Sequence, residues 1–174
     1  FLNSVLVTVG TTAGTVLSSS LVAFGFARFN FRGKNILFII LLATMMIPWD
    51  VTMIPQYMEF NLFGWINTLL PLIVPTWFGS AYHIFLMRQF LMGIPKDYEE
   101  AARLDVANTF QINWKIFMPI LKPCLIMVGI LNLLTVWIDY LCPLIFLKDR
   151  SKYTLAFGLA SFKGVHTTQI IPML

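Results

Sequence analysis

Long apolar runs alternate with short polar connectors along this chain, and four of these runs predict helices that cross a membrane. The expected helices cover about Leu2 to Ala27, Asn35 to Tyr57, Leu69 to Phe90 and Pro123 to Leu147. Residues 1–27 and 60–87 contain no charged side chain, and each stretch exceeds the roughly 20 apolar residues that cross a bilayer core as a helix. Open sheet edges cannot be satisfied in lipid, and the alternating pattern of barrel strands is missing. We therefore predict an all-α, polytopic transmembrane helical bundle.

The composition agrees with a membrane protein. Hydrophobic residues make up 58% of the chain and charged residues 11%, against about 25% charged residues in ordinary soluble domains. The net charge of +4 does not indicate nucleic acid as a partner, because the 12 Lys and Arg residues lie in short connectors and not along one face. The chain opens inside an apolar run, and its last residues, TTQIIPML, resemble the entrance to another span. We expect residues 1–174 to be a single transmembrane domain, a fragment with about four complete spans and part of another.

The distribution of Lys and Arg predicts the orientation, because short cytoplasmic loops carry an excess of these residues. Eight basic residues surround the connectors after the first and third runs: Arg28, Arg32, Lys34, Arg88, Lys96, Arg103, Lys115 and Lys122. We therefore expect residues 28–34 and 94–122 to be cytoplasmic and Glu59 to lie outside. Four further basic residues disagree, because alternation places them outside: Lys148, Arg150, Lys152 and Lys163.

Small residues follow one face of the first predicted span. Gly10 and Gly14 form a Gly-xxx-Gly pair, and Ser18 continues the same face one turn later. Residues at this spacing let two helices approach closely, although ordinary buried helices also contain them. With either interpretation, this face is expected to point toward protein more than toward lipid.

The charge that the spans lack is concentrated in the connector after the third run. Asp97 stands three residues before Glu100, which is the spacing of a capping box. Glu99 and Arg103 are four residues apart, in the order that favours an ion pair along a helix. We expect a short helix over 97–108 with no single apolar stripe. Such a helix suits a groove on another protein, and the alternative is a solvated connector that reverses the chain.

This connector also resembles a known signature. The stretch EEAARLDVANTFQINWKIFMPILKP is similar to the EAA motif of permease subunits of binding-protein-dependent ABC importers, roughly E-A-A-x-x-D-G-A followed by I-x-x-P. The matching positions are Glu100, Ala101, Ala102, Asp105, Ala107, Ile116, Pro119 and Pro123. FARFNFRGKN, FLMRQFLMGIPKDYEEAA and YTLAFGLASF resemble the carbohydrate branch of that family, of the maltose and glycerol-3-phosphate type. The likeness covers nearly the whole chain in the same order.

The resemblance implies the bundle of a type I ABC importer permease, a subunit of the bacterial inner membrane that imports a sugar or related solute. It implies that residues 94–122 form a coupling loop whose helix docks in a cleft of a cytoplasmic ATPase subunit, with Glu100 as the docking acid. The implied coupling residues are Glu99, Glu100, Ala101, Ala102, Arg103, Asp105, Val106, Ala107 and Pro119. The implied partners are a second homologous permease subunit, two ATPase subunits and an extracytoplasmic solute-binding protein.

Some features depart from the family pattern or limit the chemistry. Val106 stands where the family usually has Gly, which could supply a turn with positive φ or room for close packing. Ile138 and Cys142 replace a usual Asn and Trp. No Gly-x4-Gly-Lys-Ser/Thr sequence is present, so ATP is expected on the partner subunit and no cofactor on this chain. No catalytic arrangement is predicted, and no metal site, because His83 and His166 lack further ligands at suitable spacing.

Polar residues of the predicted fourth span are candidates for lining the transport pathway. They are Asn132, Thr135, Trp137, Asp139 and Tyr140. An ionisable group at the bilayer centre costs at least about 2.5 kcal/mol, so Asp139 either faces the pathway or holds helices together. Asn132 and Thr135 suit a polar cavity or hydrogen bonds between helices equally well. Pro48 and Pro55 break the second span, either beside a substrate cavity or at a simple kink.

Two other classes of function are compatible with parts of the sequence. A secondary transporter driven by an ion gradient would need titratable residues deep in the spans, where only Asp139 and, near an edge, Asp50 occur. A membrane protein that anchors a cytoplasmic partner without moving solute would need only the charged connector.

Overall fold

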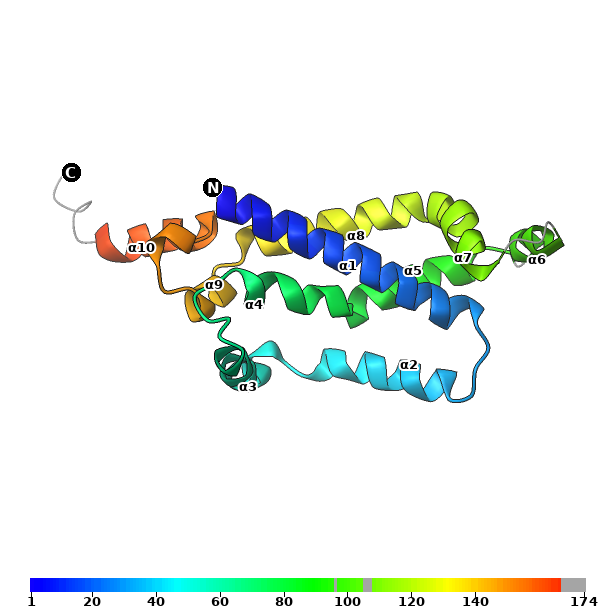
Figure 1. Cartoon of the computed structure of the whole chain (residues 1–174), viewed down its shortest axis with the longest axis horizontal. Coiled ribbons are helices and arrows are strands. Elements are labelled where there is room, and N and C mark those ends of the chain that lie inside the picture. Colours follow the sequence, from blue (N-terminus) through cyan, green and yellow to red (C-terminus); the bar gives the residue numbers. More distant parts are fainter. Residues whose placement is uncertain (96, 105–107, 167–174) are drawn as a thin grey trace, which may run out of the picture.

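The computed structural model describes residues 1–95, 97–104 and 108–166, and within those ranges it contains helices and connectors but no strand. Among the described residues, three helical segments are long and apolar enough to cross a membrane: Leu2–Arg28, Leu70–Met92 and Thr109–Ile138. They pack on one another and form the main body of the molecule (Figure 1). The predicted all-α transmembrane fold is therefore confirmed.

The three spanning segments differ in the helices and helical turns that form them. The first is a single helix, α1 (Leu2–Arg28). The second joins α4 (Leu70–Ile73), the 3-10 turn η2 (Val74–Phe78) and α5 (Ala81–Met92). The third joins α7 (Thr109–Ile112), the π-helical turn η3 (Asn113–Phe117) and α8 (Met118–Ile138). The connecting and terminal elements are α2 (Lys34–Ala43), η1 (Thr44–Met46), α3 (Trp49–Leu62), α6 (Asp97–Leu104), α9 (Leu141–Phe146), η4 (Arg150–Lys152) and α10 (Leu155–His166).

The run predicted as a second span is sharply bent. The helical stretches 34–46 and 49–62 meet at an angle of 96°, so they form a fourth span only if the bent pair is counted as one. Pro48 explains the break, because proline disfavours helical backbone in the residue before it and cannot donate a hydrogen bond. Ile47 accordingly has extended backbone, with φ −83° and ψ 113°. The break predicted at Pro48 is therefore present and joins two helices at nearly a right angle, whereas Pro55, which was predicted to break the run as well, lies inside α3.

The last predicted span lies earlier in the chain than expected. It was predicted over 123–147, but the spanning segment covers Thr109–Ile138, and α9 is a separate short helix. Pro123 was interpreted as a helix start, yet it lies inside α8. Neighbouring helices in a membrane protein can re-satisfy the backbone groups that a proline frees, and here Leu121 and Cys124 on either side of it are buried.

Helix α1 buries its polar face. The buried hydroxyl residues recur every three or four positions and so share one side of the helix: Ser4, Thr8, Thr11, Thr15 and Ser19. The apolar side chains of Leu6, Val9, Leu17 and Leu21 are exposed on the remaining surface. Lipid tails are as apolar as leucine, so small and hydroxyl side chains, which permit close packing, are favoured between helices. This inverted pattern places α1 at the centre, where it contacts α5, η2 and α8.

Gly10 and Gly14 of α1 lie against the second spanning segment. A Cβ atom built on Gly14 would be 2.6 Å from Cδ1 of Trp77, and one on Gly10 would be 3.1 Å from Cγ2 of Ile73. Ser18 Oγ donates to the carbonyl oxygen of Gly14 at 2.7 Å and reaches that of Thr76 at 3.3 Å. Gly14 therefore provides the space that the indole of η2 occupies.

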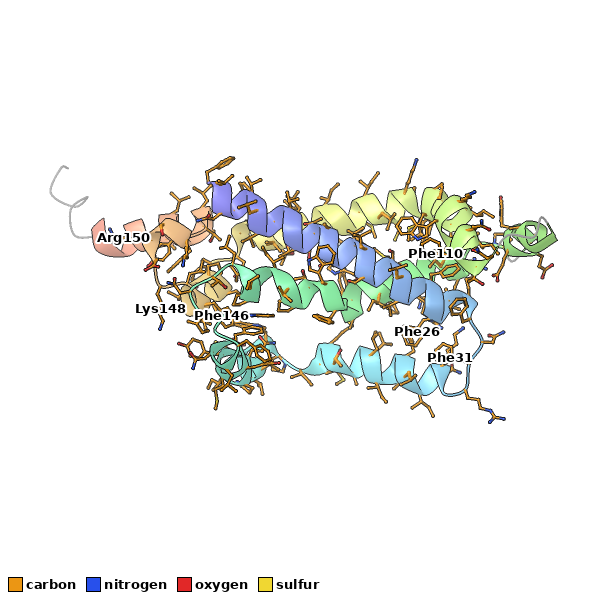
Figure 2. All side chains as sticks on the ribbon, in the orientation of Figure 1. Phe26, Phe31, Phe110, Phe146, Lys148 and Arg150 are labelled. Atoms are coloured by element: carbon orange, nitrogen blue, oxygen red, sulfur yellow. The ribbon has the colours of Figure 1, made fainter. Side chains whose placement is uncertain are left out.

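The two ends of the bundle carry different groups. Phe26 and Phe31 lie at one end, together with α6, whereas Phe146, Lys148 and Arg150 lie at the other (Figures 1 and 2). The basic residues that disagreed with the predicted orientation are thus at the end away from α6, as alternation requires. One of them has a structural role: Lys152 Nζ donates to the backbone oxygen of Asn67 at 2.7 Å and lies 3.7 Å from Asp149 Oδ2.

Asn67 ties the connector before α4 to the connector after α9. Its side-chain oxygen accepts hydrogen bonds from the backbone N–H groups of Lys148 and Asp149, both at 3.0 Å, and its Nδ2 donates to Asp149 Oδ2 at 2.7 Å. Its backbone has φ +63°, a left-handed conformation that asparagine tolerates better than most residues. The loops at this end are therefore cross-linked through one polar side chain.

Gly14→Ala is expected to destabilise the protein, whereas Gly25→Ala in the same helix is not. The new Cβ at position 14 would displace the Trp77 indole, and overpacking of this kind costs about 1 to 3 kcal/mol. A Cβ on Gly25 meets only Phe29, at 4.0 Å, and alanine is the better helix former. The measurement is the thermal unfolding midpoint of the full-length protein in detergent. Equal midpoints for the two variants would contradict the close contact.

Candidate functional site

The helix predicted to couple the bundle to a partner protrudes from one end of the molecule. α6 lies beyond the ends of α5 and α7 (Figure 1). It begins with Asp97 inside its first turn, together with Glu99 and Glu100, so Asp97 does not occupy the capping position that the predicted box required. Acidic groups in a first turn are still favourable, because the helix dipole is positive there.

A capping box exists at the next helix instead. Asn108 Oδ1 accepts from the backbone N–H of Gln111 at 2.8 Å, and Gln111 Oε1 accepts from that of Asn108 at 3.0 Å. Asn108 has extended backbone, with φ −76° and ψ 162°, so the helix predicted over 97–108 ends before it. The spacing Asn-x-x-Gln is a readable start signal that the sequence analysis missed.

The described side chains of α6 divide into two groups. Ala102 is 5% exposed and packs into the same core cluster as Ile94, whereas Glu100 and Tyr98 are exposed and Glu99 is half-buried. One position of this helix therefore packs on the bundle, while the acid at position 100 is exposed. The expectation that the helix has no single apolar stripe also involves side chains outside those described, so it stays a prediction. Other predicted coupling positions lie outside the described side chains: Ala101, Arg103, Asp105, Val106 and Ala107. The predicted Glu99–Arg103 ion pair also lies outside the described side chains, because it includes Arg103.

Arg28, at the end of α1, joins both flanks of the segment that carries α6. Its Nη2 donates to the backbone oxygens of Leu91 at 2.7 Å and of Ile94 at 2.9 Å. Carbonyls at a helix end lack partners within the helix, and a cation there is favourable. The guanidinium carbon also lies 4.5 Å from the ring centre of Phe117, a cation–π distance. One side chain thus connects α1 to the end of α5 and to the turn η3.

Pro119 lies just after the π-helical turn, in the first turn of α8. A proline lacks the N–H that would bond four residues back, and its ring crowds that carbonyl. The backbone widens here, and the N–H of Met118 bonds to the oxygen of Asn113, five residues earlier. Phe117, inside the widened turn, is fully buried. The predicted coupling residue Pro119 therefore lies where α7 and α8 meet.

The candidate pathway residues do not converge on one cavity. Asn132 is buried, and its Nδ2 donates to Oγ1 of Thr12 at 3.1 Å, so it links α8 to α1. Thr135 is exposed and bonds to the backbone oxygen of Leu131 in its own helix. Trp137 packs edge-on against Phe1, with ring centres 6.2 Å apart, and Tyr140 is 48% exposed. Thr12, on the partner helix, has no distinctive motif around it and was not among the predicted residues.

Asp139 separates α8 from α9. Its Oδ1 accepts from the backbone N–H groups of Leu141 at 2.9 Å and Cys142 at 3.3 Å, so the carboxylate caps the start of α9. Burial, a side-chain hydrogen bond with Asp139 and the charge of that carboxylate raise the pKa of Cys142 to about 12. This thiol is therefore protonated at neutral pH. Among the residues that the structure describes, no group of three His, Cys, Asp or Glu side chains could hold a metal ion.

Comparisons with known proteins agree on the class of protein. The chain is 34% identical over 165 residues to the arabinooligosaccharides transport system permease protein AraQ of Bacillus subtilis (strain 168), covering 92% of this chain and 57% of AraQ. It is 30% identical over 169 residues to the probable starch degradation products transport system permease protein AmyC of Thermoanaerobacterium thermosulfurigenes, covering 97% of this chain and 62% of AmyC. The chain thus spans about three fifths of the length of these relatives.

A solved structure shares the fold. The crystal structure of a bacterial ABC transporter involved in the import of the acidic polysaccharide alginate contains a chain with a TM-score of 0.84 and 24% sequence identity, covering 99% of this chain and 60% of that one. The family model described as the inner membrane component of binding-protein-dependent transport systems matches residues 14–159. This chain, a multi-pass membrane protein, therefore belongs to the family of binding-protein-dependent transport system inner membrane components.

Proposed function

We propose that this chain is part of the permease subunit of an ATP-driven importer for a sugar or related polyol. A second homologous permease subunit completes the translocation pathway, and two cytoplasmic ATPase subunits hydrolyse ATP. An extracytoplasmic solute-binding protein delivers the solute. Family membership supports the class of protein, and the names of the relatives, which refer to arabinooligosaccharides and starch degradation products, support a carbohydrate.

The observation that carries the proposal is the position of α6 between two fixed points. Before α6, the end of α5 is bonded to Arg28, and after it the capping box of Asn108 starts α7. Ala102 packs on the bundle, while Glu100 faces outward. A short helix held in this way transmits a displacement of its outer face, whereas a loose connector would absorb it.

The displacement has two routes into the bundle. One runs through α5, which packs along α1 and α8, and the other through α7 and η3 into α8. Arg28 contacts both routes through Leu91, Ile94 and Phe117. Movement of the ATPase subunits would then reorient α5 and α8 together, because the same guanidinium contacts the end of α5 and the turn η3 that leads into α8.

Glu100→Gln is expected to lower solute uptake at least about tenfold, because a hydrogen bond to a charged group is worth about 1.5 to 3 kcal/mol. The substitution keeps the shape of the side chain and removes the charge that we assign to ATPase docking. Uptake is measured with the complete transporter in liposomes loaded with ATP. Glu59→Gln is the matched control, an exposed acid on α3, and uptake should be unchanged. Normal uptake in Glu100→Gln would count against docking through this acid.

Two glycines inserted after Glu100 should uncouple ATP hydrolysis from uptake without removing the ATPase subunits. Each glycine destabilises a helix by about 1 kcal/mol relative to alanine, so α6 would lose its stiffness. The readouts are co-purification of the ATPase, ATP hydrolysis and solute taken up per ATP hydrolysed. Unchanged uptake per ATP hydrolysed would contradict the coupling mechanism. A chain that never co-purifies with an ATPase subunit would instead support one of the two alternative functions, a membrane anchor for a cytoplasmic partner or a secondary transporter.

Arg28→Gln should reduce uptake per ATP more strongly than Arg32→Gln. Both variants remove one positive charge near the end of α1, but Arg32 is an exposed loop residue, and only Arg28 contacts α5 and η3. Each lost charged hydrogen bond is worth about 1.5 to 3 kcal/mol, so the thermal midpoint is recorded beside uptake. Arg28→Lys retains the positive charge but not the guanidinium, so we expect it to restore the thermal midpoint more fully than uptake per ATP. Equal coupling in Arg28→Gln and Arg32→Gln would argue against the role of the guanidinium.

A further inference from the structure

The second spanning segment is interrupted near its middle, between the turn η2 and the helix α5 (Figure 1). Gly79 has φ +93°, a conformation that glycine adopts without strain, and Ser80 has extended backbone with φ −120° and ψ 124°. Counted from Leu70, Gly79 is the tenth of the 23 residues of this segment. The interruption therefore lies roughly halfway through a hydrocarbon core about 30 Å thick.

The backbone groups of the interruption that are paired bond to hydroxyls of α1. Ser18 Oγ donates to the backbone oxygen of Thr76 at 3.3 Å, and the N–H of Ser80 donates to Ser19 Oγ at 3.3 Å. Other N–H groups have no hydrogen-bond acceptor within the described part of the chain: those of Gly79, Ala81, Tyr82 and His83. The buried Nδ1 atom of His83 also has no partner there.

Unpaired N–H groups at this depth require a polar environment. Irregular backbone in the membrane is tolerated only where it is buried in protein or lines a water-filled cavity. This chain does not bury the interruption, because Phe78 is 82% exposed and Tyr82 is exposed as well. A neighbouring transmembrane helix offers few acceptors, because its own carbonyl oxygens are bonded within the helix. Water and the hydroxyl groups of a solute supply the acceptors that lipid and helix backbone lack.

Three aromatic rings flank the interruption, and each has an exposed surface: Trp77, Phe78 and Tyr82. The indole of Trp77 rests on Gly14 of α1, and the ring of Tyr82 packs edge-on against His83, with ring centres 5.3 Å apart. Aromatic side chains present a large contact area at a low cost in conformational entropy. The apolar faces of sugar rings stack on such side chains, while the sugar hydroxyls bond to polar groups nearby. Rings beside unpaired donors therefore suit a polyhydroxylated ligand.

We propose that this interruption lines the translocation pathway and contacts the solute as it passes, with Phe78 and Tyr82 as stacking surfaces and the N–H groups at the start of α5 as donors. The ligand class is a sugar or related polyol. The inference rests on the proposed transport function and adds the segment of this chain that meets the solute. It moves the contact from the third spanning segment, where the sequence-predicted pathway residues lie, to the second.

Cysteine labelling tests water access without requiring a solute. The complete transporter is placed in liposomes with its native thiols removed, Cys124→Ser and Cys142→Ser, and a charged thiol reagent is present on both faces. The control is Leu17→Cys, on the exposed apolar surface of α1 about one turn from Gly14. Phe78→Cys should be labelled at least about tenfold faster, because hydrocarbon excludes a charged reagent. Equal labelling rates at the two positions would overturn the assignment to the pathway.

Solute contact is tested with the sugar that the transporter takes up best from a panel of arabinose and glucose oligosaccharides. This sugar should protect the thiol of Phe78→Cys from the reagent. Phe78→Ala should lower uptake about tenfold, the order of effect that loss of one stacked aromatic side chain has on ligand binding. Because Phe78 is exposed, this variant should fold normally.

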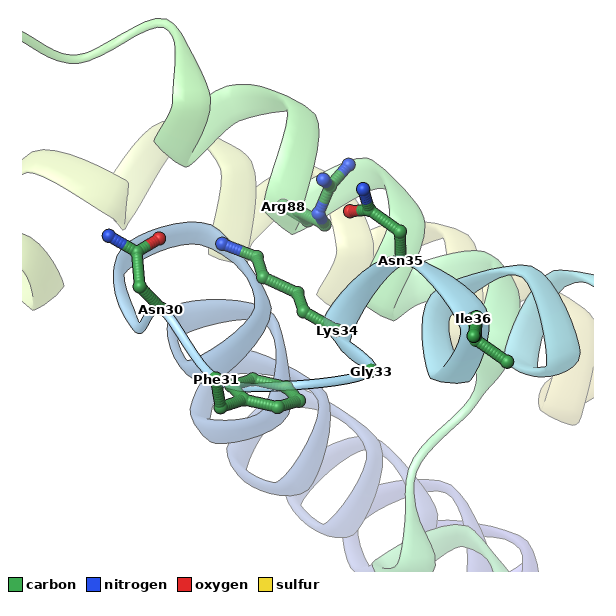
Figure 3. A pocket seen from close by; sticks show the side chains of 7 residues that line it. All are labelled: Asn30, Phe31, Gly33, Lys34, Asn35, Ile36 and Arg88. Atoms are coloured by element: carbon green, nitrogen blue, oxygen red, sulfur yellow. The ribbon is translucent and has the colours of Figure 1, made fainter.

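The matched control for uptake is Phe31→Ala, which should transport as the wild type does. Phe31 is also an exposed phenylalanine, but it lines a cavity between the connector after α1 and the side of α5, at the end of the bundle that carries α6 (Figure 3). An equal loss of uptake in both variants would overturn a specific role for Phe78.

The outcomes separate this inference from the proposed function. If the sugar is transported but neither protects position 78 nor responds to Phe78→Ala, the solute contact is overturned and the proposed function stands. Rapid labelling of position 78 without uptake of any sugar would support a water-filled pathway and overturn a sugar as its solute. Normal uptake with position 78 as unreactive as position 17 would show that protein or lipid covers the interruption, and would overturn the inference.

Discussion

The fold depends on α1 burying its hydroxyl face and exposing its apolar face. In lipid no hydrophobic force drives helices together, so their association relies on close packing and on satisfied polar groups. Thr11 and Ser20 bond to carbonyl oxygens within α1, which leaves these buried hydroxyls without a polar penalty. Other bonds cross between helices: Asn132 donates to Thr12, and the N–H of Ser80 donates to Ser19 at 3.3 Å. The second and third spanning segments therefore each pack on α1 and form a hydrogen bond with it.

Two prolines of similar local chemistry have opposite effects, and packing explains the difference. At Pro48 the helical backbone is interrupted, and its neighbours Met46 and Ile47 are 84% and 54% exposed, so they have little packing against the described part of the chain. At Pro119 the neighbouring Phe117 is fully buried against Phe24 and Arg28, and the backbone widens by one residue without ending the helix. Tertiary contacts thus decide whether a missing N–H produces a bend or a π turn.

Sequence patterns predicted the fold class and most of the spanning segments, because apolar length is a local property. They misplaced the last segment, because Pro123 looks like a boundary by local rules although Leu121 and Cys124 pack on the bundle around it. The EAA signature singled out Glu100 of α6, which is exposed in the structure. The contacts of Arg28 with Leu91 and Ile94 could not be predicted from the sequence, because they join residues more than sixty positions apart and no local pattern encodes them.

Counting basic residues predicts orientation even though individual cations in this chain have different roles. Arg28 bonds to helix-end carbonyls, Arg88 stacks on Phe38, and Lys152, at the opposite end, ties two loops through Asn67. Lys152, one of the four basic residues that disagree with the predicted orientation, has a structural role in these loops, because a backbone oxygen and a carboxylate hold its ammonium. A cation with local partners contributes less to orientation than one that faces the lipid headgroups.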